Sequence, residues 1–402
     1  MFLSHRIQLD PTEKQKAYFR KACDCARFVY NWGLEEWERQ YASGENPYGF
    51  KLITQFNAIK YDKYPWIKKI HRDAHQRPFF YIQRAYDLWR TGKKGKPKFK
   101  KKGKCRDSFY VSNQSNVMRV SGKVVKLPKI GIVRMREALR FEGKIVAATV
   151  TRTADKWFIS IRVDVGDYRK ERIDDRISGV DLGLTHVATL SNGLKFEAPK
   201  PLKKNIKKLK RLSRMLSRKQ KGSKNREKAK LKLARLHARI VNQRKDFTHK
   251  LTACLCKNHA GLVIEDLSTQ FILKNRKLSK SVSDIGFYEI RRQLEYKSLI
   301  YRCCILIASR WYPSSKTCFV CGNKKKDLTL KDRIYECSEC GMNLDRDVNA
   351  ALNLRKLFWK NTVGSTGIHA CGPEGSGRAA GDSDTTKPCW EEAGTTQTEM
   401  SP

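Results

Sequence analysis

Four cysteines near the C-terminus constrain the fold of this chain more than any other feature. Cys318 and Cys321 are separated by two residues, as are Cys337 and Cys340, and fifteen residues lie between the two pairs. Two such pairs let four thiolates converge tetrahedrally on one zinc ion. A glycine follows each pair, where the chain must turn sharply. We therefore expect a zinc ribbon over residues 314–342.

Acidic residues follow the second cysteine pair directly. Residues 343–360 contain Asp345, Asp347 and Asn349 and continue as an apolar-periodic run, which predicts a helix with acids in its first turn. A carboxylate in that position can act simply as a helix cap, because the positive end of the helix dipole favours negative charge. Taken alone, the motif favours a cap over a catalytic role.

Two more carboxylates lie in apolar runs that predict strands. Asp181 lies between Gly179 and Gly183, and Glu265 ends the run that begins at Gly261. An unpaired buried carboxylate is costly, so acids at such positions usually have a cation beside them. Carboxylate oxygens suit magnesium, and two such ions about 4 Å apart can activate water and stabilise the leaving oxygen of a phosphodiester. Together with Asp347, these acids predict the metal site of a nuclease.

The segments GVDLGLTHVATLSNG, VIEDLS and DRDVNAALNL occur in this order, with the four-cysteine segment between the last two. They resemble the three split RuvC motifs and the zinc element of the TnpB family, which comprises insertion-sequence-encoded, RNA-guided DNA nucleases related to type V CRISPR effectors. The resemblance covers roughly residues 1–370. It implies an RNA-guided endonuclease of a transposable element that cuts double-stranded DNA next to a short flanking motif.

The resemblance also assigns residues and ligands. It implies that Asp181, Glu265 and Asp347 are catalytic and bind two Mg²⁺ ions, and that the cysteines bind one Zn²⁺ ion. Asp347 is chosen over Asp345 because the third acid of the family stands two residues before an asparagine, here Asn349. Asp266 and Asp345 stay open as supporting acids. The implied partners are a guide RNA from the transposon end, called omega RNA, and target double-stranded DNA, bound by a monomer.

The predicted fold is multidomain α+β, with a RuvC/RNase H-like nuclease domain. Strand-like alternation over residues 107–165 predicts a small β-barrel, which in the family forms a wedge domain interrupted by a helical recognition region. The expected parts are 1–10, a wedge strand; 11–99, the helical recognition region; 100–172, the β-barrel wedge domain; 173–313, the nuclease; 314–342, the zinc ribbon; 343–360, the third-motif helix; and 361–402, a disordered tail. Cys371 and Cys389 in the tail have no CxxC partner, so we expect no second zinc site there.

Charge restricts the partners of the chain. The 84 Lys and Arg residues outweigh 40 Asp and Glu residues, and the formal net charge of +44 would oppose compaction without a polyanion. No apolar run approaches the roughly 20 residues that span a bilayer, and the N-terminus lacks a signal-peptide core. The cysteines outside the ribbon are expected to be free thiols, as in a reducing compartment. We expect a cytoplasmic protein with no membrane contact.

Candidate nucleic-acid contacts lie in the recognition region. Residues 75–89 read HQRPFFYIQRAYDLW, in which Gln76, Arg77 and Gln83 are residue types that contact base edges and phosphates. Residues 91–106 carry nine basic residues and no acid. Such a run can be a solvated loop, but we favour phosphate contact through residues such as Lys98 and Lys100.

Two later segments have helical periodicity. Residues 201–250 hold 20 basic and two acidic residues around two apolar stripes, which predicts a basic αα-hairpin along RNA or an RNA–DNA duplex, with an oligomerising coil as the alternative. Its candidate contacts are Lys203, Lys207, Arg211 and Arg214. Residues 287–310 predict one core helix.

Two other classes of function remain open from the sequence. A guide-RNA-dependent repressor or transposition regulator would bind without cutting, but it would have no need for three buried acids. A zinc-ribbon protein that binds RNA structurally would explain the charge and the cysteines, but neither Asp181 nor Glu265.

Overall fold

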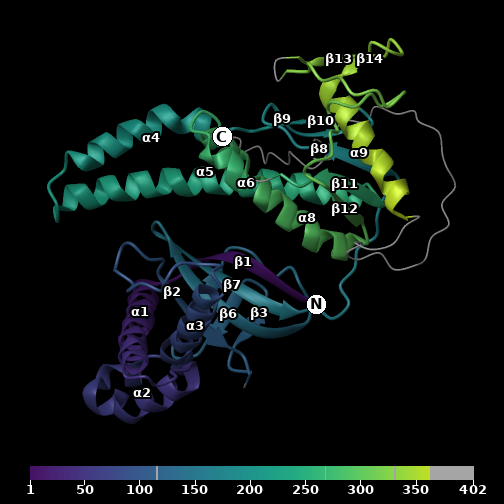
Figure 1. The fold of residues 1–402 in the computed structure, drawn as a ribbon. Coiled ribbons are helices and arrows are strands. Elements are labelled where there is room, and N and C mark those ends of the chain that lie inside the picture. The colour runs from purple at the N-terminus through teal and green to yellow at the C-terminus, as the bar shows by residue number, and fades with distance from the viewer. Residues whose placement is uncertain (115, 268, 330–331, 363–402) are drawn as a thin grey trace, which may run out of the picture. The chain divides into compact units, whose positions relative to one another are not determined.

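The computed structural model describes residues 1–114, 116–267, 269–329 and 332–362. The described residues divide into two compact units, Met1–Tyr168 and the residues from Arg169 onward, each with its own sheet (Figure 1). The tail was predicted to span residues 361–402. Only positions 361 and 362 belong to the described residues, and the rest, including Cys371 and Cys389, fall outside them.

A seven-stranded antiparallel sheet forms the base of the first unit, in the order β2-β6-β7-β1-β5-β4-β3. Its strands are β1 (Phe2–Asp10), β2 (Ser108–Ser112), β3 (Arg119–Ser121), β4 (Val124–Leu127), β5 (Gly131–Met135), β6 (Lys144–Thr153) and β7 (Lys156–Asp164). Alternate side chains of β1 and β7 are buried, as in a sheet with one face on a core. Because β1 pairs with both β7 and β5, the first ten residues complete this sheet. Within the described residues β2 and β3 are its ends, so closure into a barrel stays a prediction.

Helices fill the sequence between β1 and β2. They are α1 (Glu13–Ala42), α2 (Gly49–Lys63), the 3₁₀ helix η1 (Pro65–Lys69) and α3 (Arg72–Arg90). Phe19 of α1 is fully buried, with its ring centroid 5.7 Å from that of Phe109 on β2 and 5.0 Å from that of Trp157 on β7. The helices and the sheet therefore share one hydrophobic core.

The second unit is built on a five-stranded sheet in the order β10-β9-β8-β11-β12. Its strands are β8 (Ile177–Asp181), β9 (His186–Leu190), β10 (Lys195–Glu197), β11 (Gly261–Glu265) and β12 (Cys304–Ala308). Strands β8, β11 and β12 run parallel, whereas β9 and β10 continue from β8 as an antiparallel meander. Parallel strands end at the same edge of a sheet, here called the carboxyl edge, and Asp181 and Glu265 are the last residues of β8 and β11.

Helices cover both faces of this sheet, as buried parallel strands require. Leu262 and Ile264 of β11 pack with residues of α5 (Lys224–Lys257) and α8 (Phe287–Tyr301). Val263 points the other way and packs with Leu354 of α9 (Arg346–Thr362). The second unit thus joins a mixed sheet to helices on two sides, and the α+β class predicted from the sequence is confirmed.

One predicted helix is wrong in its second half. Residues 287–310 were expected to form one helix, but α8 ends at Tyr301 and Cys304–Ala308 form the edge strand β12. Arg302 takes a left-handed backbone conformation, with φ of 53°, and this ends the helix. The run Cys304–Ala308 is apolar throughout, so its periodicity alone could not separate a buried strand from a helix.

The predicted basic αα-hairpin is present as α4 (Pro201–Ser217) and the N-terminal part of α5, which lie side by side in Figure 1. Two short helices, α6 (Thr269–Lys274) and α7 (Ser279–Ile285), follow β11. The carboxylate of Asp284 in α7 accepts the backbone N–H groups of Leu202 and Lys203 and the Nε–H of Arg244, at 2.8–3.2 Å. This buried acid caps α4 and ties it to α5, which fixes the base of the hairpin.

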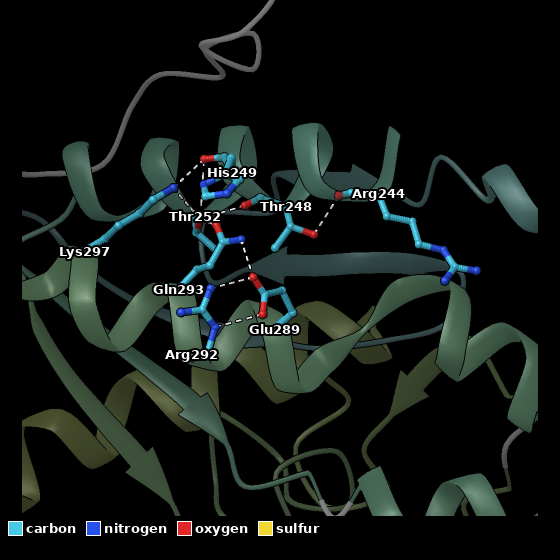
Figure 2. A network of polar contacts seen from close by, with 8 residues as sticks. All are labelled: Arg244, Thr248, His249, Thr252, Glu289, Arg292, Gln293 and Lys297. Atoms are coloured by element: carbon cyan, nitrogen blue, oxygen red, sulfur yellow. Dashed lines mark hydrogen bonds and ion pairs between the residues drawn. The ribbon is translucent and has the colours of Figure 1, made fainter. Parts of the chain in front are cut away.

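A polar network joins α5 to α8 (Figure 2). Gln293 donates to Glu289 at 2.9 Å and accepts from the Thr252 hydroxyl at 3.0 Å. The Lys297 amine donates to the same hydroxyl at 2.7 Å and to the backbone oxygen of His249 at 2.6 Å. Burial lowers the pKa of this amine to about 8. A buried lysine held by neutral oxygens therefore lies between the two helices that cover one face of the sheet.

The four-cysteine segment forms a separate small lobe of the second unit. Its ladder pairs β13 (Ile334–Glu336) with β14 (Asn343–Asp345), and β14 leads directly into α9. Tyr335 of β13 is fully buried, and its hydroxyl lies 3.2 Å from the backbone oxygens of Lys316 and Asn323, to either of which it can donate. The lobe extends three residues beyond the predicted end at 342.

Cysteines outside this lobe only partly follow the expectation of free thiols. Cys23, Cys25, Cys256 and Cys303 are free and buried. Cys254 and Cys304 are disulfide-bonded, which the sequence did not predict.

Candidate active site and metal centre

The four cysteines of the predicted zinc ribbon converge. Their sulfur atoms all lie within 4.8 Å of one another, with 3.6 Å between those of Cys318 and Cys340 and 3.5 Å between those of Cys321 and Cys337. Four sulfurs at about 2.3 Å from a tetrahedral zinc ion are about 3.8 Å apart, so the observed spacing fits that ion. Hydrogen bonds from the backbone N–H groups of Cys340 and then Glu339 lower the pKa of the Cys337 thiol to about 6, whereas burial and hydrogen bonds with the other thiols raise that of Cys321 to about 12. Cys337 is therefore the first thiol of the set to ionise.

The strand register places Asp181 and Glu265 next to each other. Val180 of β8 is opposite Ile264 of β11 in a parallel ladder, and the two acids are the next residues on each strand. Paired residues of neighbouring strands point to the same face of a sheet. Val180 and Ile264 pack on the α5 and α8 side, so both carboxylates lie on the α9 side.

Helix α9 reaches the same place because β8 has a glycine two residues before Asp181. A Cβ atom at Gly179 would lie 1.9 Å from the backbone oxygen of Ala351 and 2.6 Å from the backbone nitrogen of Arg355. The helix backbone therefore rests directly on the strand. From this contact, Asp347 lies one helical turn before Ala351, in the direction of the carboxyl edge. Asp181 lies two strand positions beyond Gly179 in the same direction, so both acids lie toward that edge.

Electrostatics show that the three carboxylates interact. Burial raises the pKa of Asp181 well above its usual range, and the negative charges of Glu265 and then Asp347 raise it further. Burial also raises the pKa of Glu265, against the hydroxyl of Ser314 and the nearby Arg346, which lower it. Such crowding of acids is unfavourable unless a cation or a proton compensates it.

The chemistry of this oxygen-only set fits magnesium. In the part of the chain that the structure describes, the cysteine cluster is the one group of three or more Cys, His, Asp or Glu side chains whose ligand atoms all lie within 4.8 Å of one another. The carboxylates are thus spread more widely than a cage around one ion. Magnesium keeps several waters and is usually held by one or two carboxylates together with substrate phosphate, which suits a spread set.

The two acids that the sequence left open as supporting residues have other partners. Asp345 accepts the N–H groups of Asp347 and Val348 at 3.0 and 3.1 Å and pairs with Lys195 at 2.6 Å, so it is the N-cap of α9. Asp266 accepts from Arg291 and Arg310, both at 2.7 Å. The helix cap that sequence reasoning weighed against catalysis is therefore present at Asp345, two residues before Asp347.

A buried amide network that the sequence analysis missed links the four-cysteine lobe to the acids. Asn349 and Asn353 of α9 are almost fully buried, and both donate to the backbone oxygen of Thr317, at 2.8 and 2.6 Å. Asn353 also donates to the backbone oxygen of Ser314 at 2.8 Å, and the Ser314 hydroxyl donates to Glu265. The spacing of four between two asparagines in the DRDVNAALNL segment was the available signal, because it places both on one helix face.

The candidate nucleic-acid contacts of the first unit differ in how available they are. Lys98 is exposed, and Gln76 is half-buried. Gln83 accepts from the N–H of Gly49 and donates to Asp87, so its amide is engaged within the protein. The Arg77 guanidinium lies 4.7 Å from the ring of Tyr110, and the Lys100 amine lies 3.7 Å from that of Tyr30.

The basic hairpin presents its candidate contacts to solvent. Lys203, Lys207, Arg211 and Arg214 are exposed and follow one another at helical spacing along α4. The leucines between them, such as Leu209 and Leu212, are half-buried. One face of α4 is therefore a continuous row of positive charge.

Three family descriptions match successive parts of the chain. They are a helix-turn-helix domain over residues 1–46, a probable transposase over residues 160–276, and the TNB domain of Cas12f1-like proteins over residues 287–354. The first covers, in this structure, strand β1 and a single 30-residue helix, α1. The third spans α8, β12, the four-cysteine lobe and the first half of α9.

Whole-chain relatives agree with these matches. "Putative RNA-guided DNA endonuclease InsQ" of Escherichia coli (strain K12) is 33% identical over 369 residues, covering 87% of this chain and 90% of that protein. A Streptomyces pristinaespiralis protein of the same description is 32% identical over 351 residues, covering 86% of each chain. A cryo-EM structure of a Cas12f1–sgRNA–target DNA complex shares the fold, with a TM-score of 0.57 at 16% identity, covering 86% of this chain and 83% of that one.

Fold and site together define a Cas12f-like α+β protein with a four-cysteine lobe beside an acid-bearing sheet edge. At this level of identity and coverage, the chain belongs to the TnpB family of transposon-related, RNA-guided DNA endonucleases. Among the described residues, no helix combines the length and the apolar character needed to cross a membrane.

Proposed function

We propose that this chain cuts double-stranded DNA beside a short flanking motif, guided by a bound RNA, through two-metal-ion hydrolysis of a phosphodiester. The convergence of Asp181, Glu265 and Asp347 on one face and one edge of the nuclease sheet carries this proposal. Family membership supports it, because relatives over most of the chain are named as RNA-guided DNA endonucleases.

In the proposed site the three carboxylates would hold two Mg²⁺ ions, and these ions would activate a water and stabilise the leaving oxygen. The protein supplies the arrangement. Ser314 fixes one oxygen of Glu265, and Asp345 caps the helix that carries Asp347. Arg346 is a cation close to both Asp181 and Glu265. One Zn²⁺ ion in the cysteine lobe is structural in this proposal, because all four ligand positions are filled by thiols.

The nucleic-acid partners follow from charge. The row of basic residues on α4 suits the phosphates of a guide RNA or of its duplex with the target strand. We assign the first unit the wedge and recognition roles, with a barrel-like sheet and an inserted helical region. Base pairing with the guide would supply most sequence specificity. The active unit would be a monomer in the cytoplasm, bound to one omega RNA.

The test begins with the RNA. The protein is purified from cells that carry its transposon end, and the bound RNA is sequenced and then replaced by one with a new guide. Cleavage that follows the new guide supports the proposal, and cleavage that ignores it removes the guided mechanism.

The metal site is tested separately with Asp181→Ala and Glu265→Ala. Each should abolish cleavage and leave RNA binding nearly unchanged. Asp175→Ala, at an acid whose side chain is 84% exposed in the same unit, is the matched control and should cut normally. Persistent cutting by either site variant would contradict the assignment, whereas bound RNA without any cutting would favour a guided repressor.

A further inference from the structure

Two aromatic side chains near the carboxyl edge are left in solvent. Trp311 is 86% exposed and Tyr288 is 70% exposed, more than any other large hydrophobic side chain among the described residues. Neither ring has an aromatic or cation–π partner in that part of the chain. Single exposed hydrophobic side chains are common on proteins, so what sets these two rings apart is their place at the carboxyl edge, beside arginines.

Both residues lie at the edge that carries the acids, Tyr288 on the helix that covers the face opposite the carboxylates. Trp311 comes three residues after the end of β12, whose carboxyl end is next to that of β11. Tyr288 is in the first turn of α8, which runs back toward the start of β12, so that turn also lies at the carboxyl edge. Ion pairs bear this out, because Arg291 of α8 and Arg310 both bind Asp266, the residue after Glu265.

The chain on either side of Trp311 is anchored. Arg310 pairs with Asp266 at 2.7 Å, and the Tyr312 hydroxyl donates to the backbone oxygen of Asn353 at 3.3 Å. Two residues further on, Ser314 donates to Glu265. The tryptophan is thus carried on a short turn that is fixed to the nuclease acids, while its ring is held outside.

We propose that Tyr288, Arg291, Arg310 and Trp311 form a stacking site for unpaired bases of the DNA strand that enters the carboxylates. Asp266 holds both arginines, and Arg291 also pairs with Glu295 at 3.1 Å. Each arginine still has N–H groups left for phosphate, since a guanidinium carries five. Their side chains are 38% and 51% exposed. Aromatic faces beside basic groups are the usual surface for single-stranded nucleic acid, because every base has a face that can stack.

The ligand is a single strand and not a duplex. In a duplex the faces of the bases are covered by their neighbours, so a protein ring can stack only on unpaired bases. A protein partner would suit an apolar patch without the flanking arginines. The inference rests on the proposed function, since it names how the substrate of that same site is held.

The experiment measures stacking without cleavage. Full-length protein with its bound RNA and the substitution Asp181→Ala is mixed, without divalent metal, with a single-stranded oligonucleotide that contains 2-aminopurine. Stacking on a ring quenches the fluorescence of this base. Trp311→Ala and Tyr288→Ala should each weaken binding by about 5- to 150-fold and relieve the quenching, and Trp311→Phe should restore most of both.

Trp359→Ala is the matched control, because Trp359 is 60% exposed on the same unit but near the far end of α9. It should bind and quench normally. In the cleaving protein, Trp311→Ala should raise KM for a pre-opened target with little change in kcat. Unchanged affinity and quenching in both aromatic variants would overturn the stacking site, even in a protein that cuts. Failure of the wild type to cut any DNA would instead count against the proposed function and leave the binding measurement interpretable.

Discussion

The substitution Gly179→Ala tests the central geometric claim, that α9 reaches the acids only because β8 has no side chain at this position. The added Cβ would lie 1.9 Å from the backbone oxygen of Ala351, whereas ordinary van der Waals contact begins at 3.4 Å. The helix must therefore retreat by about 1.5 Å, the difference of these two distances. The atoms that the new Cβ would meet belong to the backbone of α9, so no side-chain rotation can relieve the clash.

The consequence for activity follows from the position of Asp347, one turn from Ala351 on the same helix. A retreat of that size moves its carboxylate away from Asp181 by a similar distance. Displacements of about 1 Å can reduce the rate on the order of 100-fold, so we expect at least that loss of single-turnover cleavage. Overpacking should also lower the free energy of unfolding by about 1–3 kcal/mol.

Gly261→Ala is the matched control for this experiment. It lies on the neighbouring strand β11, and its new Cβ would meet the Phe358 ring of the same helix at 2.6 Å. That contact is with the end of a side chain, which can rotate away, and it is far from Asp347. We expect a comparable loss of stability with cleavage within about tenfold of wild type, since the acids keep their places. A Gly179→Ala protein with unchanged melting temperature and unchanged cleavage would refute the close packing of α9 on β8.

Three further predictions concern the rest of the molecule. Cys337→Ser should lose one equivalent of zinc and lower the melting temperature, and unchanged metal content on elemental analysis would remove the zinc centre. Because burial lowers the pKa of Lys297 to about 8, the folded state releases its proton before the unfolded state does, so this group makes the free energy of unfolding rise between about pH 8 and pH 10.4. In denaturant titrations, Lys297→Met should remove that rise, whereas Lys250→Met, at an exposed lysine, should keep it. If the free energy of unfolding had the same pH profile in wild type and in Lys297→Met, Lys297 would not be buried in solution. Replacing both Lys203 and Lys207 with glutamine should reduce the salt slope of RNA binding by about 1.4 for a single strand and about 1.8 for a duplex, and an unchanged slope would place α4 away from the RNA.

Local sequence signals predicted the parts of the site that depend on a few neighbouring residues. The cysteine spacing and its two glycines specify the knuckles, and Gly322 and Gly341 do take positive φ, at 81° and 66°. The apolar runs before Asp181 and Glu265 likewise specify buried strands that end in acid. These predictions succeed because the conformation of each of these segments is determined mainly by its own residues.

The remaining features depend on pairings between distant segments. The register of Val180 against Ile264 brings two acids together, yet nothing within either strand selects it. Strand β12 was missed because a short apolar run after a helix has no distinguishing period, and its pairing with β11 decides its conformation. Gly179 appears in the sequence as one flank of an acidic motif, and only the packed helix shows why a glycine is needed there.

The amide network attaches the four-cysteine lobe to the acids of the candidate site at both of its ends. The lobe leaves the sheet near Ser314, which binds Glu265, and returns through β14 into α9, which carries Asp347. Asn353 then joins the outgoing and returning segments at the backbone oxygen of Ser314. Structural zinc contributes folding free energy directly, and here both ends of the stabilised segment are attached to acids of the site. Loss of the proposed zinc ion should therefore disturb the positions of Glu265 and Asp347 together, although no cysteine is a ligand in the proposed magnesium site.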